Sequence, residues 1–185
     1  MSSARSSSER SETESPASWR ERAAAVADPL RPPAELPREL LSEIYAHARE
    51  CYPEECCGLL LGPSGAGLHI LRCTNVQSQR FARGESHLDA RRGFWIDAQE
   101  LESALREAEG RDERLHAVYH SHIDTEAYLS HTDLLAATGP GGSPVWPGVA
   151  QLVISVRDGA VRGAALFEWD TSTARFLGRV VRESR

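Results

Sequence analysis

One short stretch of the chain contains two histidines, a serine and an aspartate. His120 and His122 are separated by one residue, and Ser130 and Asp133 follow after a further seven residues. Imidazole nitrogens and carboxylate oxygens are, with thiolates, the usual protein ligands of zinc. The spacing therefore predicts a metal site that uses both histidines and the aspartate.

The elements expected around these residues bring them together. The apolar run from Leu115 to His122 indicates a strand, and side chains two apart on a strand, such as those of His120 and His122, point to the same face. A short helix is expected from Ser130 to Thr138, where residues three apart share a face. Three protein ligands with one open position, which would hold water, are typical of a catalytic zinc rather than a structural one.

A hydrolytic zinc site also needs a base, and two adjacent glutamates are candidates. Glu55 begins the apolar run 55–62, where an acidic side chain is costly unless it has a role. Glu54 belongs to the turn after Pro53 and is the less favoured alternative. A carboxylate outside the ligand set would take a proton from the attacking water and later protonate the leaving amine.

Each part of this pattern also has a structural explanation. Ser130 and Asp133 have the spacing of a capping box, and the two roles can coexist. A His-x-His pair on a strand is often an ordinary polar edge. His116 and His131 lie nearby but outside the spacing, so we expect them beside the site or at the surface. The combination of the four positions with Glu55 favours the metal site.

Composition limits the classes of partner. The 185 residues have a net charge of -6 and no concentrated basic surface, so no nucleic-acid partner is predicted. No apolar run approaches the roughly 18 residues that span a bilayer, and the N-terminal sequence lacks the apolar centre of a signal peptide. We therefore expect a cytoplasmic protein without a membrane partner. The cysteines, which lack C-x2-C spacing and are expected to be reduced packing residues, are Cys51, Cys56, Cys57 and Cys73.

The order of the elements predicts one α/β domain. Residues 1–35 are rich in serine and proline and are expected to form a disordered tail, with a short helix around Trp19 to Ala27. Residues 36–185 are expected to form an α/β sandwich around a mixed, mostly antiparallel sheet. Its expected elements, besides those named above, are helices at 37–51 and 97–110 and strands at 55–62, 68–76, 94–96, 149–156, 161–169 and 175–181.

These residues resemble the motif of the JAMM (MPN+) zinc metalloprotease family. The motif has two parts here, Pro53-x-Glu55-x-Cys57-Gly58 and His120-Ser121-His122-x7-Ser130-x2-Asp133. The resemblance covers roughly residues 37–183. It implies a three-layer-like, cytidine-deaminase-like sandwich with a curved sheet and flanking helices.

The resemblance also implies roles and a reaction. His120, His122 and Asp133 would bind one zinc ion per chain, Glu55 would be the general acid and base, and Ser130 would hydrogen-bond the tetrahedral oxyanion. Family members hydrolyse amide or isopeptide bonds of ubiquitin-like proteins, and prokaryotic members act at the C-terminus of sulfur-carrier proteins. The expected partner is thus a carrier with a Gly-Gly-type C-terminus.

Two features depart from the family pattern. Many members have proline after the second histidine and before the serine, whereas this chain has Ile123 and Leu129, so its backbone is less constrained.

Two functions are alternatives to the zinc peptidase. One is a binding scaffold of the same fold without catalysis, and the other is a metal-dependent amidase for a small metabolite.

The 77–93 segment is long for a loop, and we expect it to be a flap or insertion that influences substrate choice. Polar side chains beside it are expected either to contact a substrate tail or to face water: Arg72, Asn75, Arg80 and Arg83.

Overall fold

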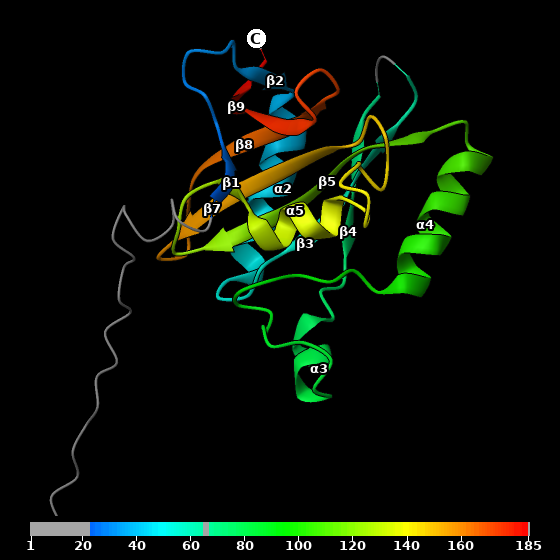
Figure 1. Ribbon diagram of the computed structural model, residues 1–185, viewed down its shortest axis with the longest axis vertical. Coiled ribbons are helices and arrows are strands. Elements are labelled where there is room, and N and C mark those ends of the chain that lie inside the picture. The colour runs from blue at the N-terminus through cyan, green and yellow to red at the C-terminus, as the bar shows by residue number, and fades with distance from the viewer. Residues whose placement is uncertain (1–22, 65–66, 185) are drawn as a thin grey trace, which may run out of the picture.

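The protein forms three layers. The structure, a computed structural model, describes residues 23–64 and 67–184. Helix α2 (Arg38–Cys51) covers one face of a seven-stranded sheet, and helices α4 (Ala98–Gly110) and α5 (His131–Ala137) lie on the other (Figure 1). The α/β sandwich expected from the sequence is confirmed.

The large sheet is mixed and mostly antiparallel. Its strand order is β2-β9-β8-β7-β5-β3-β4. The strands are β2 (Ala34–Leu36), β3 (Cys57–Gly62), β4 (His69–Cys73), β5 (Arg114–Ile123), β7 (Ala150–Arg157), β8 (Ala160–Asp170) and β9 (Arg175–Glu183). Among the described strands of this sheet, only the pairs β2–β9 and β5–β7 are parallel. Parallel neighbours need a crossover connection, and the one between β5 and β7 contains β6 (Tyr128–Ser130) and α5.

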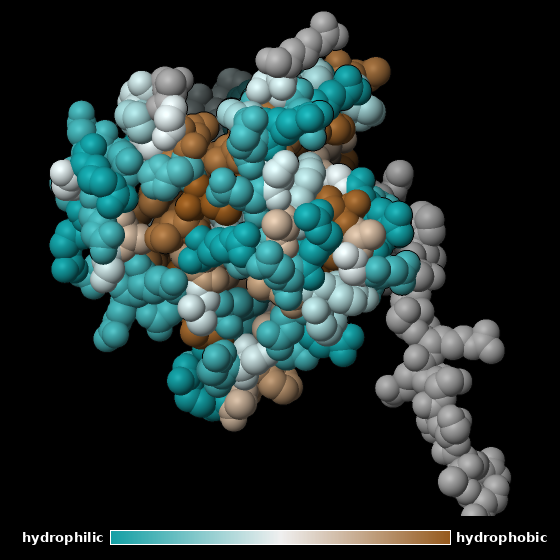
Figure 2. Space-filling view, turned by 180° about the vertical axis from the view of Figure 1, so that it is seen from behind, coloured by the Kyte–Doolittle hydropathy of each residue, from teal (hydrophilic) through white to brown (hydrophobic). Residues whose placement is uncertain are grey.

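Helix α2 covers the sheet with the apolar stripe that the sequence predicts. Its buried apolar residues are Leu40, Leu41, Ile44 and Ala48. They pack with Tyr119 and Leu152 of the central strands. Seen from behind, the molecule is mostly hydrophilic, with one larger group of apolar side chains and smaller ones elsewhere on that face (Figure 2). No helix within the described ranges has the length and apolar character needed to cross a membrane.

Strand β3 lies between β4 and β5 and is buried along its whole length. A Cβ atom at Gly58 would lie 2.4 Å from both the carbonyl oxygen of Leu71 and the ring of Tyr119. The Tyr119 ring therefore occupies the space that a side chain would need, and its hydroxyl is 2.9 Å from Nδ1 of His47. This close approach explains the glycine of the Cys57-Gly58 pair.

The 77–93 segment differs from the expected loop. It begins with helix α3 (Gln77–Ala82). The predicted strand 94–96 is absent, and only an isolated bridge joins Ile96 to Asn75. The backbone N–H of Trp95 donates to the side chain of Asn75, so side-chain bonding replaces a strand ladder here.

The N-terminal part of the fold is also different from the prediction. In place of the expected helix, strand β1 (Ala23–Val26) pairs antiparallel with β6, and residues 34–36 form β2. An alanine-rich stretch favours helix locally, but pairing with a distant strand overrides that preference. The fold therefore includes residues that the predicted boundary at 36 assigns to the tail. Residues 1–22 lie outside the described ranges, so their predicted disorder stays a prediction.

Candidate metal centre

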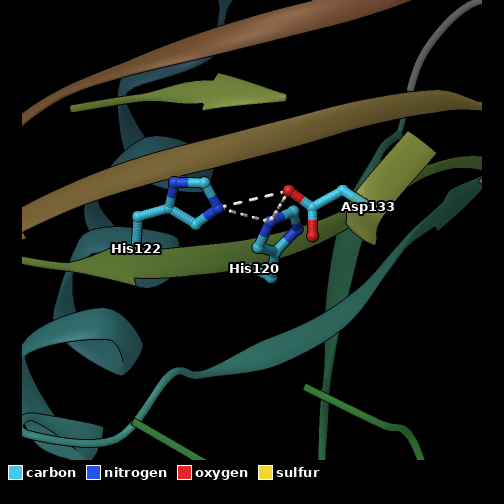
Figure 3. Close-up of side chains that lie close together, drawn as sticks. All are labelled: His120, His122 and Asp133. Carbon is cyan, nitrogen blue, oxygen red and sulfur yellow. Dashed lines mark hydrogen bonds and ion pairs between the residues drawn. The ribbon is translucent and has the colours of Figure 1, made fainter. Parts of the chain in front are cut away.

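Three ligand atoms meet on one face of β5, an interior strand of the large sheet. His120 and His122 project from β5, and Asp133 faces them from the first turn of α5 (Figure 3). Nε2 of His120 lies 3.3 Å from Nε2 of His122, and Oδ2 of Asp133 lies 3.4 and 3.3 Å from these two nitrogens. All three residues are buried.

This triangle has the size that a single zinc ion requires. Zinc binds histidine nitrogen at about 2.0–2.1 Å, and at the tetrahedral angle two such ligands are about 3.3–3.4 Å apart. The three observed separations agree with that value. The three residues could therefore hold a metal ion, and no other such group occurs within residues 23–64 and 67–184.

The two imidazole rings are oriented in different ways. Nδ1 of His122 lies 3.2 Å from the carbonyl oxygen of Glu126, to which it can donate, so the Nε2 lone pair can point at the ligand triangle. The His120 ring stacks on Phe94 at 4.4 Å between centroids, and its Nδ1 is buried with no hydrogen-bond partner among the residues that the structure describes. Packing orients His120, whereas a hydrogen bond orients His122.

The electrostatics of the cluster suit metal binding. Burial lowers the pKa of His120. Burial alone would also lower the pKa of His122, but the hydrogen bond and charge of Asp133 raise it. Burial would raise the pKa of Asp133, yet the two histidines hold it well below its usual range. Without a metal, therefore, a proton shared with the carboxylate stabilises the cluster, and metal binding has to displace it.

Ser130 and Asp133 form the capping box expected from their spacing. The hydroxyl oxygen of Ser130 accepts from the backbone N–H of Asp133 at 3.0 Å, and Oδ2 of Asp133 accepts from the N–H of Ser130 at 2.8 Å. The capping box is thus present, and it leaves the chemical roles expected for the same two side chains sterically compatible with it. The hydroxyl hydrogen of Ser130 is not used by the cap.

Glu55 lies near His122, two residues before β3 begins. Only 6% of its surface is exposed, and burial raises its pKa to about 8; the charge of His122 opposes this shift, and that of Asp133 adds to it. Glu54 is exposed and accepts a 3.3 Å hydrogen bond from Ser78. The structure therefore brings Glu55, and not Glu54, to the ligand triangle.

A cleft of about 310 Å³ opens onto this arrangement. It is lined by Glu55, Leu88, Arg91, Arg92, His122, Ile123, Thr125, Tyr128, Ser130, His131 and Thr132. One residue of the ligand triangle, His122, thus shares a cleft with Glu55 and Ser130. A water molecule placed there has an acceptor in the glutamate, and a substrate carbonyl has a donor in the serine.

Asn75 organises this cleft, a role that the sequence does not reveal. Its side-chain nitrogen donates to the carbonyl oxygens of Glu55 at 2.9 Å and of Gly93 at 3.2 Å. Its side-chain oxygen accepts from the N–H groups of Gln77 at 3.0 Å and of Trp95 at 3.1 Å. One amide therefore joins the backbone of the buried glutamate to both ends of the 77–93 segment. The available signal was an asparagine at the end of a strand, where such side chains often bond nearby backbone.

The other polar residues considered for substrate contact lie elsewhere. Arg72 pairs with Glu50 at 2.6 Å, and Arg80 stacks over the ring of Trp95 at 3.7 Å. Arg83 pairs with Glu85 at 2.8 Å. None of these arginines lines the cleft. Arg91 and Arg92, which no sequence pattern singled out, do line it.

His131 and the cysteines are placed as expected, whereas His116 is half-buried away from the cleft. His116 lies 3.0 Å from the carbonyl oxygen of Gly62 and does not line the cleft, whereas His131 is exposed at its edge. All four cysteines are free, and three of them are buried. Burial raises the pKa of Cys56 and Cys73 to about 12, so these thiols are packing groups.

Comparison with characterised sequences finds relatives over part of the chain. Proteins of Mycobacterium tuberculosis and Mycobacterium bovis, each named CysO-cysteine peptidase, are 36% identical over 105 residues. The match covers 55% of this chain and 64% of each relative. The aligned part is therefore less than two thirds of the relatives' length.

Two solution structures have a similar fold. One, of a protein from Desulfitobacterium hafniense, has a TM-score of 0.56 and 19% identity, over 82% of this chain and 93% of that chain. The other, of a protein from Salinibacter ruber, has a TM-score of 0.53 and 27% identity, over 81% of this chain and 91% of that one. These likenesses agree with the layered arrangement described above.

The family assignment depends on a match that includes every residue of the site. The model of prokaryotic homologues of the JAB domain matches residues 37–170, which contain the histidine pair, Asp133, Ser130 and Glu55. The resemblance to the JAMM family is thereby confirmed. The chain belongs to the family of prokaryotic homologues of the JAB domain.

Proposed function

We propose that this protein is a zinc peptidase that hydrolyses an amide or isopeptide bond at the C-terminus of a ubiquitin-like sulfur-carrier protein. One observation above all supports it: three ligand atoms separated by 3.3–3.4 Å lie beside a buried glutamate in an open cleft. The name of the mycobacterial relatives supports the choice of a sulfur carrier as substrate.

His120, His122 and Asp133 would hold the metal. A bound zinc ion would supply a Lewis acid and lower the pKa of a water molecule to about 7. The donor set of two imidazoles and one carboxylate leaves one position for the reactants, as in other catalytic zinc sites. The ligand positions are fixed by a strand and by a capped helix, so they need little rearrangement.

Glu55 would move the protons. It accepts one from the attacking water, whose oxygen bonds to the substrate carbonyl carbon, and donates one to the nitrogen as the C–N bond breaks. Its pKa of about 8 applies without a bound metal ion; the added positive charge of the metal would favour the carboxylate and lower this value, so the group would be ionised when it acts as a base. Burial excludes competing water from its carboxylate.

Ser130 would stabilise the oxyanion. Its hydroxyl lines the cleft and keeps its hydrogen available after accepting the capping bond. A single donor of this kind contributes about 3 kcal/mol to transition-state stabilisation. Because the same hydroxyl caps α5, its position is fixed before substrate binds.

The alternative functions fit less well. A scaffold without catalysis has no need for a buried glutamate beside three converging ligand atoms, because burying a carboxylate is costly. An amidase for a small metabolite would use the same residues, but the sequence relatives favour a carrier protein. We therefore propose the carrier peptidase.

The test compares two neighbouring glutamates. Zinc content is measured for wild type, Glu55→Gln and Glu54→Gln, together with cleavage of a ubiquitin-fold sulfur carrier extended by one cysteine at its Gly-Gly terminus. We expect one zinc per chain in all three and loss of cleavage only in Glu55→Gln. Glu54→Gln is the matched control, because it removes the same charge one residue away at the surface. Wild-type cleavage by Glu55→Gln would refute the proposed base.

A further inference from the structure

Two arginines line the cleft without a role in the proposed mechanism. Arg91 and Arg92 share this cleft with Glu55, His122 and Ser130. Both arginines are exposed, and neither forms an ion pair with the described residues. Two arginines therefore line the cleft with guanidinium groups that form no ion pair with the described residues.

The other arginines of the 77–93 segment are paired. Arg80 and Arg83 both contact the carboxylate of Glu85, at 3.6 and 2.8 Å. The nearest acid in sequence to the cleft arginines is Asp89, and it accepts a hydrogen bond from the backbone N–H of Arg91 at 3.1 Å. Glu85 thus pairs with Arg80 and Arg83, whereas no carboxylate of the segment pairs with Arg91 or Arg92.

The cleft arginines follow a residue that is joined to the proposed base. Ala90 is fully buried, and its carbonyl oxygen accepts a 2.7 Å hydrogen bond from the N–H of Glu55. Its own N–H donates to the hydroxyl of Ser78 at 3.2 Å. The backbone at Ala90 is therefore fixed relative to Glu55, and the two arginine side chains begin one and two residues later.

We propose that Arg91 and Arg92 bind the free α-carboxylate of a single amino acid, which is the leaving group of the reaction. The inference rests on the proposed function and specifies its substrate. Guanidinium groups recognise carboxylates by paired, charge-assisted hydrogen bonds. In an amino acid the carboxylate is only two bonds from the nitrogen that leaves, so its receptor has to line the same cleft as the base.

The alternative leaving group does not satisfy these arginines. In an isopeptide the departing nitrogen is the ε-amine of a protein lysine, which continues into four methylene groups and has no carboxylate nearby. The proposed reaction adds water to the last carbonyl carbon of the carrier and breaks the C–N bond. The carrier leaves with a free carboxylate, and the amino acid leaves with a protonated amine. The enzyme is then a carrier–amino-acid peptidase rather than an isopeptidase.

A binding experiment isolates the subsite from catalysis. In the Glu55→Gln background, the affinity is measured for a sulfur carrier ending in Gly-Gly-Cys, prepared once with the free C-terminal carboxylate and once as the carboxamide. We expect the free acid to bind about tenfold to a hundredfold more tightly. One or two charge-assisted hydrogen bonds contribute an affinity gain of this size. Arg91→Ala combined with Arg92→Ala should remove this preference, and the two lysine replacements should restore part of it.

Arg83→Ala is the matched control, because it removes the same charge from the same segment outside the cleft. It should keep the full preference for the acid. Equal affinity of the acid and the carboxamide for Glu55→Gln, or a preference that survives in the double alanine variant, overturns the subsite. Cleavage of both probes by wild type at equal rates also overturns it but leaves the proposed function intact. If wild type cleaves neither the free acid nor the carboxamide, the proposed function is refuted, whatever the binding result.

Discussion

Ser130 and Asp133 exchange two hydrogen bonds, of 3.0 and 2.8 Å, and the same Oδ2 atom of Asp133 lies 3.3 Å from Nε2 of His122. One carboxylate oxygen therefore both caps helix α5 and completes the ligand triangle. Removing its charge and removing the cap are different changes, and they can be separated by substitution.

We expect Asp133→Asn to lose zinc while keeping most of the fold stability. The amide oxygen still accepts from the N–H of Ser130, but the anionic ligand is gone. Asp133→Ala loses the cap as well and should cost a further 1 kcal/mol, approximately, in the metal-free protein. Chelator competition measures the zinc affinity, and urea unfolding measures the stability. Wild-type zinc affinity in Asp133→Asn would exclude this residue as a ligand.

Ser130→Ala should lower kcat about a hundredfold or more, because an oxyanion donor is lost. It should also destabilise the metal-free protein by about 1 kcal/mol through loss of the cap. Asp97→Ala is the control, since Asp97 caps α4 through the N–H groups of Gln99 and Glu100, away from the cleft. That variant should lose similar stability and keep its kcat. If both variants lose activity equally, the effect is one of stability and not of oxyanion binding.

Asn75→Ala should reduce turnover without removing the metal. The change breaks all the bonds between this side chain and the backbone of Glu55 and of the 77–93 segment. Limited proteolysis should then cut the segment faster, and kcat should fall because Glu55 is less well positioned. Gln79→Ala, an exposed position on α3, should behave as wild type in both measurements. Proteolysis and kcat both unchanged in Asn75→Ala would contradict the role.

Glu55 should make the stability of the metal-free protein depend on pH. Its pKa is raised from 4.5 to about 8 on folding because burial disfavours the carboxylate. The folded state thus favours the protonated form, and this stability is fully present below pH 4.5 and is lost as the pH rises to about 8. Between these limits the free energy of unfolding should fall by up to about 1.4 kcal/mol per pH unit. Urea unfolding with a chelator should show this slope in wild type relative to Glu55→Gln, and parallel curves for the two proteins would contradict it.

The sequence was most informative where function depends on local geometry. His120 and His122 share a face because strands have a period of two, and Ser130 with Asp133 could be placed by helical spacing alone. Glu55 could be recognised because an acid at the start of an apolar run needs a reason. These arguments involve only short-range periodicity, and the structure brings all five residues together.

The features that the sequence did not reveal depend on long-range contacts. The Asn75 side chain bonds backbone groups on both sides of the 77–93 segment, and no period or motif encodes such a set of contacts. Arg91 is close to the cleft because the neighbouring Ala90 bonds Glu55, which lies 35 residues earlier in the printed sequence. Strand β1 exists because β6 is available to pair with it.

The pairing of β1 with β6 has a practical consequence. Ala23 is the register partner of Ser130, so the first described strand supports the residue at which helix α5 begins. A shorter chain that started at residue 36, where the composition changes, would leave the N–H and C=O groups of that edge of β6 without their β1 partners. Trimming the protein for crystallisation should therefore stop ahead of Ala23, because the apparent tail includes a strand that supports the candidate metal centre through β6.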